Sequence, residues 1–191
     1  MIIYATKQTI DRYKLKMPNE LTPPMNELIE AVIEKESGNK LCEWGGKIFY
    51  FDHRKCIQIV NFASKFTLFL MDVKVNDIEH LGNFITDYLF DLYSNDKKMK
   101  KALRRMFKKH PIMCFSKLKD RSIIATLNAT QRLYADDGYY FYEYLSNGVL
   151  HTKKINYDVN FKYIFTMKVN GKTDYFNAGE KFKELVIEKY G

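Results

Sequence analysis

The most concentrated chemistry in this sequence is a run of cations between residues 97 and 109. Eight of these 13 residues are Lys or Arg: Lys97, Lys98, Lys100, Lys101, Arg104, Arg105, Lys108 and Lys109. Clustered cations bind polyanions, because each contact with a phosphate releases a condensed counterion. The run therefore predicts a surface for nucleic acid or a ribonucleoprotein. An acidic protein surface, an anionic membrane and plain solvation are the alternatives.

Two histidines beside further cations are the candidate catalytic residues. His53 precedes an Arg-Lys pair, and His151 lies two residues before Lys153 and Lys154. Metal-independent RNA cleavage needs a base for the 2′-hydroxyl, an acid for the leaving oxygen and a cation near the phosphate. His53 or His151 would supply the base, and Lys153 and Lys154 extend the nucleic-acid-binding set. The alternative is that both histidines are ordinary loop residues.

The sequence predicts neither a metal nor a cofactor. Its three cysteines, Cys42, Cys56 and Cys114, form no CxxC pair and no even framework. This pattern argues against a zinc site or a disulfide scaffold and fits a reducing, cytoplasmic environment. No phosphate-binding glycine loop, GxSxG sequence or Cys–His signature occurs.

Aromatic residues offer a second way to contact nucleic acid. The chain has one Trp, Trp44, and its 14 Tyr include a dense group at Tyr139, Tyr140, Tyr142 and Tyr144. Such rings can stack on unpaired bases. Packing in a hydrophobic core is the competing interpretation, and it is the favoured one for both.

The cationic run must form a helix that docks by an apolar stripe. Its apolar residues recur at i, i+4, i+7 and i+8: Met99, Leu103, Met106 and Phe107. Asp96 can cap the start of this helix, and Pro111 stops it. The expected element is a basic amphipathic helix over residues 96–110.

The remaining pattern predicts an α+β fold, with a mixed or antiparallel sheet flanked by helices and a smaller C-terminal α/β portion. We expect sheet strands at 2–5, 47–51, 56–60, 66–71 and 112–115, and a hairpin of 164–169 and 172–176 around Asn170-Gly171. Further helices are expected near 6–13, 25–36, 77–93 and 182–189. Asp120 or Ser122 can cap one more helix, which carries Ile123, Ile124 and Leu127. We divide the chain into a core domain, 1–135, and a Tyr-rich portion, 136–191, packed on it.

Composition and charge limit the function classes. The chain has 191 residues, is 46% hydrophobic and carries a formal charge of +8. Residues 1–96 hold 11 basic and 14 acidic residues (net −3), whereas residues 97–191 hold 20 and 9 (net +11). This asymmetry favours a polyanion-facing C-terminal half. No apolar run is long enough for a signal peptide or a membrane span, so no membrane partner is expected.

Several segments resemble a bacterial family of domains of unknown function that also occurs at the N-terminus of plasmid ORF-3-type proteins. They are Ile2–Lys7, Trp44, Arg54-Lys55, Val60-Asn61 and Asp120–Asn128, so the resemblance covers residues 1 to about 135. His53 and Ala125 depart from the family pattern, where Arg and Gly are usual. A weaker resemblance, to type II-A anti-CRISPR proteins, implies inhibition of a CRISPR effector through its guide RNA.

Three functional hypotheses follow. The leading one is an RNA- or ribonucleoprotein-binding inhibitor, in its sharpest form an anti-CRISPR protein acting on a guide-RNA-loaded type II effector. The second is a protein-interaction module without nucleic-acid contact. The third is a metal-independent ribonuclease or toxin that uses His53 or His151. The sequence leaves the oligomeric state open.

Overall fold

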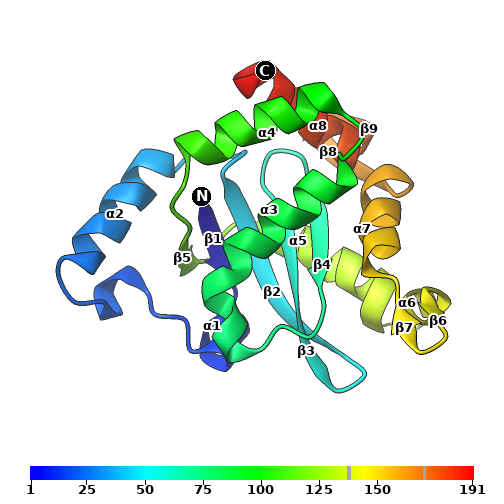
Figure 1. Ribbon diagram of the computed structural model, residues 1–191, viewed down its shortest axis with the longest axis horizontal. Helices are drawn as coiled ribbons and strands as arrows, with labels where there is room; N and C mark the ends of the chain where they lie inside the picture. The colour runs from blue at the N-terminus through cyan, green and yellow to red at the C-terminus, as the bar shows by residue number, and fades with distance from the viewer. Residues whose placement is uncertain (137–138, 170) are drawn as a thin grey trace.

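A five-stranded mixed sheet forms the centre of the computed structural model, which describes residues 1–136, 139–169 and 171–191 (Figure 1). The strand order is β4-β3-β2-β1-β5. Strand β1 is parallel to both of its neighbours, whereas β2, β3 and β4 form antiparallel hairpins. The strands are β1 (Ile2–Ala5), β2 (Glu43–Phe51), β3 (Arg54–Asn61), β4 (Thr67–Leu70) and β5 (Cys114–Lys117). The α+β class predicted from the sequence is confirmed.

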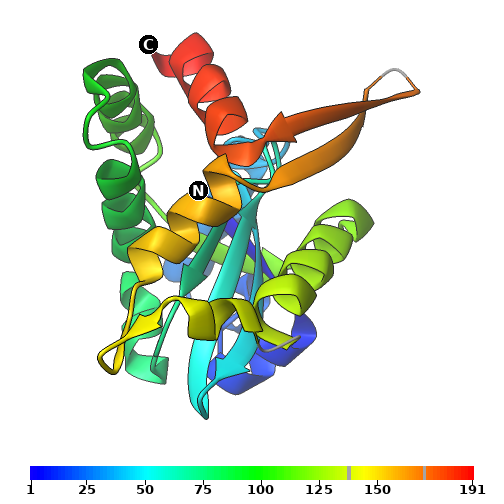
Figure 2. The ribbon, with the colours of Figure 1, turned by 90° about the vertical axis from the view of Figure 1, so that its right-hand side faces the viewer.

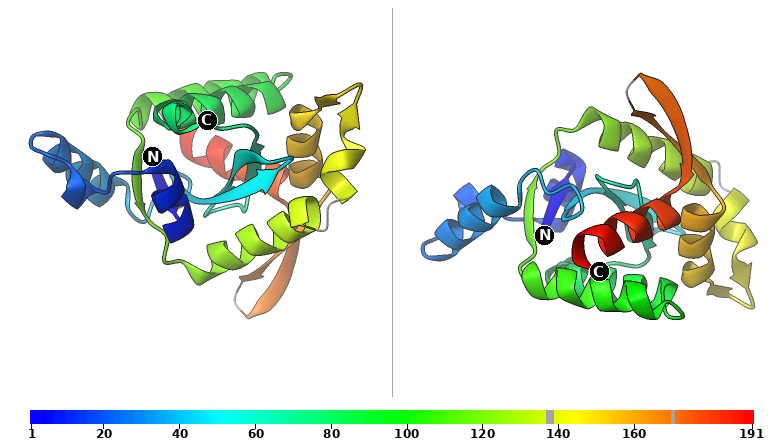
Figure 3. Two further views of the ribbon diagram at one scale, coloured as in Figure 1. Left: turned by 90° about the horizontal axis from the view of Figure 1, so that it is seen from below. Right: turned by 90° about the horizontal axis from the view of Figure 1, so that it is seen from above.

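Helices cover both faces of this sheet, which explains why its strands are nearly continuous apolar runs. One face carries α3 (Leu81–Leu92), α4 (Lys97–Lys109) and α8 (Ala178–Tyr190), and the other carries α5 (Arg121–Gln131). Seen from below, the sheet lies between α3 and α4 on one side and α5 on the other (Figure 3, left). Helix α1 (Lys7–Tyr13) follows β1 directly and contacts β2.

Helix α7 (Thr152–Phe161) closes the β4 edge of the sheet. The side-chain amide of Asn156 accepts from Phe69 N–H at 2.7 Å and donates to its carbonyl at 3.1 Å. Asn160 does the same with Thr67, at 2.8 and 2.6 Å. Two asparagines on one helix face thus take the place of a neighbouring strand and satisfy an edge that would otherwise be open to another chain.

The main core is aromatic and draws on the whole length of the chain. Trp44 lies 5.8 Å from Phe182 between ring centroids, and Phe66 lies 4.9 Å from Phe182. Tyr93 stacks on Phe66 at 6.2 Å. The described part of residues 136–191 therefore shares one core with the N-terminal segments.

Smaller elements surround this frame. These smaller elements are a 3₁₀ turn (Pro18–Glu20), a π-helical turn (Arg132–Asp136), α6 (Tyr139–Glu143), β6 (Leu145–Ser146), β7 (Val149–Leu150), β8 (Ile164–Val169) and β9 (Lys172–Asn177). Strands β6 and β7 form one hairpin, and β8 and β9 form a second that projects from the body (Figure 2). The antiparallel pairing of β8 with β9 confirms the predicted hairpin, and Asn170 of its predicted turn lies outside the described residues. Within the described ranges, no helix combines the length and apolar character needed to cross a membrane.

Several predicted boundaries were wrong. Strand β2 begins at Glu43, four residues before the predicted start, and α8 begins at Ala178, also four residues early. The helix expected over 77–93 begins at Leu81, because Val75–His80 forms a 3₁₀ turn in which Asp77 Oδ2 accepts from Lys74 N–H at 2.8 Å. The strand expected at 112–115 is β5, two residues later, because its register with β1 pairs Ile2 with Cys114.

Helix α2 (Met25–Glu36) stands away from the rest of the molecule (Figures 1 and 3). Its apolar stripe was predicted correctly as helical, but Met25 and Leu28 are 50% and 47% exposed. Only Glu36, at its last turn, is buried. The helix is therefore anchored at its C-terminal end.

Candidate nucleic-acid interface

The predicted basic helix is α4, and it docks on the protein by its apolar stripe. Met99, Ala102, Leu103 and Met106 are all buried. Its main packing partner is α8, which lies beside it (Figure 3, right). The stripe fixes the rotation of the helix and therefore the direction in which its cations point.

The cations of α4 form one exposed face. Lys100 is half-buried, and the other seven are exposed: Lys97, Lys98, Lys101, Arg104, Arg105, Lys108 and Lys109. In the part of the chain that the structure describes, none of the eight lies within 4.0 Å of a carboxylate in an ion pair. Arg105 Nη1 donates to the Tyr190 carbonyl at 3.3 Å. The face thus presents its positive charge to solvent.

Asp96 fixes the start of α4. Its Oδ1 accepts from Met99 N–H at 2.9 Å, and its Oδ2 pairs with Lys183 of α8 at 2.9 Å. The Met99 hydrogen bond and then the Lys183 contact lower the pKa of this carboxyl. A carboxylate at a helix N-terminus also interacts favourably with the helix dipole. The N-cap predicted from sequence is confirmed.

A buried polar cluster fixes the other end of α4. His110 Nδ1 lies 2.7 Å from Glu36 Oε1, and its Nε2 lies 3.0 Å from the Tyr190 hydroxyl. Asn39 donates to Cys42 Sγ at 3.1 Å and to the Tyr190 hydroxyl at 3.4 Å. The ends of α2, α4 and α8 are therefore joined by hydrogen bonds at the start of β2.

The same cluster contains three side chains that could ligate a metal. Among the described residues, Glu36, Cys42 and His110 are the only His, Cys, Asp or Glu group whose ligand atoms lie within 4.8 Å of one another. Both ring nitrogens of His110 already have hydrogen-bonding partners. Burial raises the pKa of the Cys42 thiol, which favours the protonated form over the thiolate that a metal needs. The arrangement is that of a structural hydrogen-bond network.

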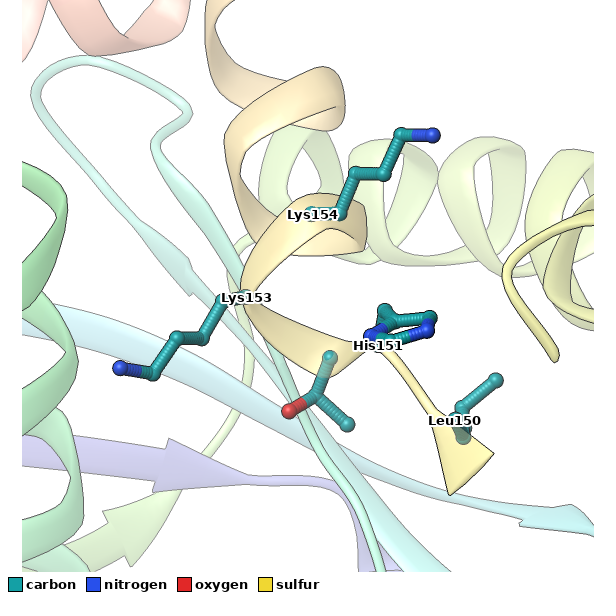
Figure 4. A pocket seen from close by; sticks show the side chains of 5 residues that line it. Leu150, His151, Lys153 and Lys154 are labelled. Carbon is teal, nitrogen blue, oxygen red and sulfur yellow. The ribbon is translucent and has the colours of Figure 1, made fainter. Parts of the chain in front are cut away.

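His151, Lys153 and Lys154 line a separate pocket of about 470 Å³ at the start of α7 (Figure 4). Their side chains point in different directions (Figure 4). Lys153 Nζ pairs with Asp91 of α3 at 3.0 Å, and Lys154 Nζ lies 5.6 Å from the centre of the Tyr144 ring. The structure therefore brings these three residues into one pocket without directing them at a common point.

His53 lies in the β2–β3 turn, at the opposite end of the sheet from α4 (Figure 1). Both Asp52 and His53 have positive φ, 48° and 61°, as a tight hairpin turn requires. The neighbouring Arg54 pairs with Asp72 at 3.4 Å. His53, the His151 pocket and the α4 face thus form three separate sites.

The aromatic candidates divide between core and surface. Trp44 is fully buried and cannot stack on a base, so the core interpretation holds. Tyr142 is 55% exposed, whereas Tyr144 is half-buried and donates to Asp158 at 2.8 Å. The side chains of Tyr139 and Tyr140 lie outside the described part.

The sequence interpretation missed the residues that hold α4 in place. Lys183 and Tyr190 come from α8, 87 and 80 residues beyond the residues Asp96 and His110 that they contact. Periodicity shows that α4 has an apolar face but does not show which element covers it. No local signal in the sequence could have paired these helices.

Comparison with known proteins adds one finding. Residues 2–181 match the model of a family described as a domain of unknown function, DUF6933. The match extends well beyond residue 135, where the resemblance predicted from sequence ended. No curated protein matches, and no solved structure matches.

Proposed function

Since the chain belongs to the DUF6933 family, a domain of unknown function, we propose a function from its own surface: it binds RNA or a ribonucleoprotein through the cationic face of α4. The observation that carries this proposal is the set of seven exposed cations on one packed helix, without carboxylate partners among the described residues. A solvated helix would not need such a concentration of one charge sign.

The geometry of α4 suits a nucleic-acid backbone. Lys97, Lys101, Arg104 and Lys108 follow helical spacing and form a row about 16 Å long, at 1.5 Å per residue. That length spans several phosphates of a single strand or a duplex. The helix is held at both ends and along its stripe, so little conformational entropy is lost when its cations engage a polyanion.

In its sharper form, the proposal is that the ribonucleoprotein is a type II CRISPR effector and that the chain inhibits it at or near the guide RNA. The support is the anti-CRISPR resemblance together with a basic face suited to the exposed parts of a bound guide. Lys153 and Lys154 would form a second, weaker contact, and His53 or His151 would act only if the RNA is cut.

The decisive binding experiment is a charge reversal on α4. The variant K101E/R104E/R105E/K108E should abolish RNA binding, measured by fluorescence anisotropy at several salt concentrations. For the unchanged protein, log Kd should vary linearly with log salt. If the variant retains weak binding that can be measured at the lowest salt concentrations, the loss of four phosphate contacts should reduce its slope by about 3. K153E/K154E should cause a smaller loss.

A matched control carries the same change in net charge elsewhere. Lys7, Arg12, Lys16 and Lys35 are also exposed, so K7E/R12E/K16E/K35E should retain most of the affinity. Equal losses in both variants would show that only net charge matters and would contradict an α4 site. Unchanged binding by the α4 variant would contradict it directly.

One denaturing gel separates the sharper form from its rivals. Guide RNA is incubated with the protein, with and without the CRISPR effector and Mg²⁺, while cleavage of target DNA by the effector is followed. Inhibited cleavage, or RNA shortened only when the effector is present, supports the inhibitor. RNA cut without the effector favours a ribonuclease, and H53A and H151A then identify the base. Intact RNA, no binding and full effector activity leave a protein-interaction module.

A further inference from the structure

A lysine–serine pair lies at the start of α5, the helix that covers the sheet face opposite α4 (Figure 3, left). Lys65 Nζ donates to Ser122 Oγ at 2.8 Å. Lys65, in the β3–β4 turn, is only 5% exposed, whereas Ser122, in the first turn of α5, is exposed. Both line a pocket of about 360 Å³ between α5 and β8.

Lys65 is in an unusual environment for a lysine. In the described ranges, no carboxylate lies within 4.0 Å of its amine, although burying an ammonium without a counter-charge is costly. Burial lowers the pKa of Lys65, Asp120 partly opposes this effect, and Lys40 adds to it. A buried lysine with a lowered pKa holds a larger fraction of neutral amine, the form that accepts a proton.

The turn that carries Lys65 is fixed by Asn61. The Asn61 side-chain oxygen accepts from Ala63 N–H at 3.1 Å and from Ser64 N–H at 3.2 Å, and its amide donates to the Leu41 carbonyl at 3.0 Å. Lys65 itself has φ of 61°, in the left-handed region that a non-glycine residue rarely adopts. Strained residues of this kind often occur at functional sites.

Ser122 is placed as a nucleophile at the start of a helix. Asp120 Oδ1 accepts from Ile123 N–H at 2.9 Å, and the first intrahelical bond runs from Ile124 N–H to the Asp120 carbonyl. The peptide N–H groups of Arg121 and Ser122 therefore precede the hydrogen-bond ladder of the helix. Donors in that position can stabilise an oxyanion that forms beside Ser122 Oγ.

We propose that Ser122 is an acyl-accepting nucleophile, that Lys65 is its general base, and that the pocket takes carboxylic esters with short acyl chains. Serine–lysine pairs are an established way of activating a serine hydroxyl. The pocket wall on α5 includes Ala125 and Ala129 together with Thr126 and Thr130, and the opposite wall includes Phe165. Small side chains on one wall and an aromatic ring on the other leave room for a compact acyl group.

The reaction balances with water as the only co-reactant. The neutral Lys65 amine takes the Ser122 hydroxyl proton as Oγ bonds to the ester carbonyl carbon. The C–O bond to the alcohol then breaks, and the Lys65 ammonium returns that proton to the leaving oxygen. Water next attacks the acyl-serine with Lys65 accepting its proton. The C–Oγ bond breaks, Oγ regains the proton, and the carboxylic acid is released.

The test uses the full chain with a fluorophosphonate probe and with p-nitrophenyl acetate and butyrate. Peptide mass mapping should find the phosphonyl adduct on Ser122, and ester hydrolysis should show an acylation burst. S122A should lose both signals. K65R keeps a buried cation and a hydrogen-bond donor but cannot act as base, so labelling should fall by at least about 100-fold. S94A and K16M, both at exposed positions, are the controls and should stay within about twofold.

A purely structural hydrogen bond predicts different results. Labelling of Ser122 that persists in K65R, or a folded protein whose Ser122 is never labelled, would overturn the proposal. The pH dependence of the labelling rate is measured on the unchanged protein, so this test does not require any variant to fold. The labelling rate should rise with pH and reach a plateau. The midpoint of that rise should lie below 10.5, the ordinary pKa of a lysine amine. A rate that rises with hydroxide without a plateau would argue against Lys65 as base.

Discussion

At the scale of single residues, the Glu36–His110–Tyr190 network is the feature with the clearest energetic consequence. Burial alone would raise the pKa of Glu36, but the hydrogen bond and charge of His110 outweigh this effect and lower the pKa below its ordinary value of 4.5. Burial raises the pKa of Tyr190, so its hydroxyl remains protonated in the network. A carboxylate held in this way stabilises the folded state only while it is ionised.

The first prediction follows from the sign of that shift. The stabilisation from Glu36 is fully present above pH 4.5 and is lost as the pH falls through the lower folded-state pKa. E36Q should therefore lower the free energy of unfolding by about 3 kcal/mol at pH 7, since it breaks a buried pair. Urea unfolding at pH 7 and at pH 3 measures both values, and the difference between E36Q and the unchanged protein should shrink at pH 3.

E34Q is the matched control, because Glu34 lies on the same helix and is exposed. Its effect should stay within about 0.5 kcal/mol at both pH values. An E36Q protein as stable as E34Q at pH 7 would show that the network contributes no net stability.

Little of this residue-level detail could be predicted from the sequence. Histidines beside basic residues indicated a catalytic site at His53, His151, Lys153 and Lys154. The fold places these residues in two separate sites. The Glu36–His110 and Lys65–Ser122 contacts join residues 74 and 57 positions apart. One signal was present for Lys65: it is the only charged residue between Cys56 and Met71.

At the scale of elements, α4 could be predicted because all of its determinants are local. Its cap, its apolar stripe and the proline that follows it all lie between residues 96 and 111. Helix α2 shows the limit of the same argument. Its stripe correctly predicted a helix, but amphipathicity does not say whether an apolar face is covered. Here Met25 and Leu28 are exposed, and the rest of the stripe is only half-buried.

The second prediction concerns the start of α4. D96A removes both the N-cap acceptor and the ion pair with Lys183, so it should destabilise the protein by about 1–2 kcal/mol. D96N keeps an oxygen that can cap but lacks the charge, so it should cost less. Thermal unfolding of both variants separates the two contributions. Equal losses would mean that the ion pair, and not the cap, holds this end.

At the scale of the whole molecule, the sheet depends on pairings between distant segments. Strand β1 lies between β2 and β5, so residues 2–5 pair with residues 43–46 and 114–117. The sequence indicated the α+β class and the two antiparallel hairpins, which are local. It could not indicate the parallel pairings or the asparagine-lined edge, because a crossover leaves no periodic signal in either strand.

The third prediction tests whether α8 is part of the core. A chain that ends at Asn177 loses Phe182, which contacts both Trp44 and Phe66, and exposes the buried stripe of α4. It should lose cooperative unfolding, and the emission of Trp44 should shift to the red as its ring meets water. A full-length F182L variant, which retains an apolar side chain, should unfold cooperatively at a lower temperature. A truncated chain with blue-shifted emission and a sharp transition would show that residues 1–177 fold alone.

The aromatic cluster also determines when the protein can fold in the cell. Ribosomes release the N-terminal segments first, so Trp44 and Phe66 emerge more than 100 residues before Phe182. During most of translation these rings lack the partner that covers them. The nascent chain therefore carries exposed aromatic surface and an incomplete core until α8 has left the exit tunnel, and it is most prone to aggregation during that interval.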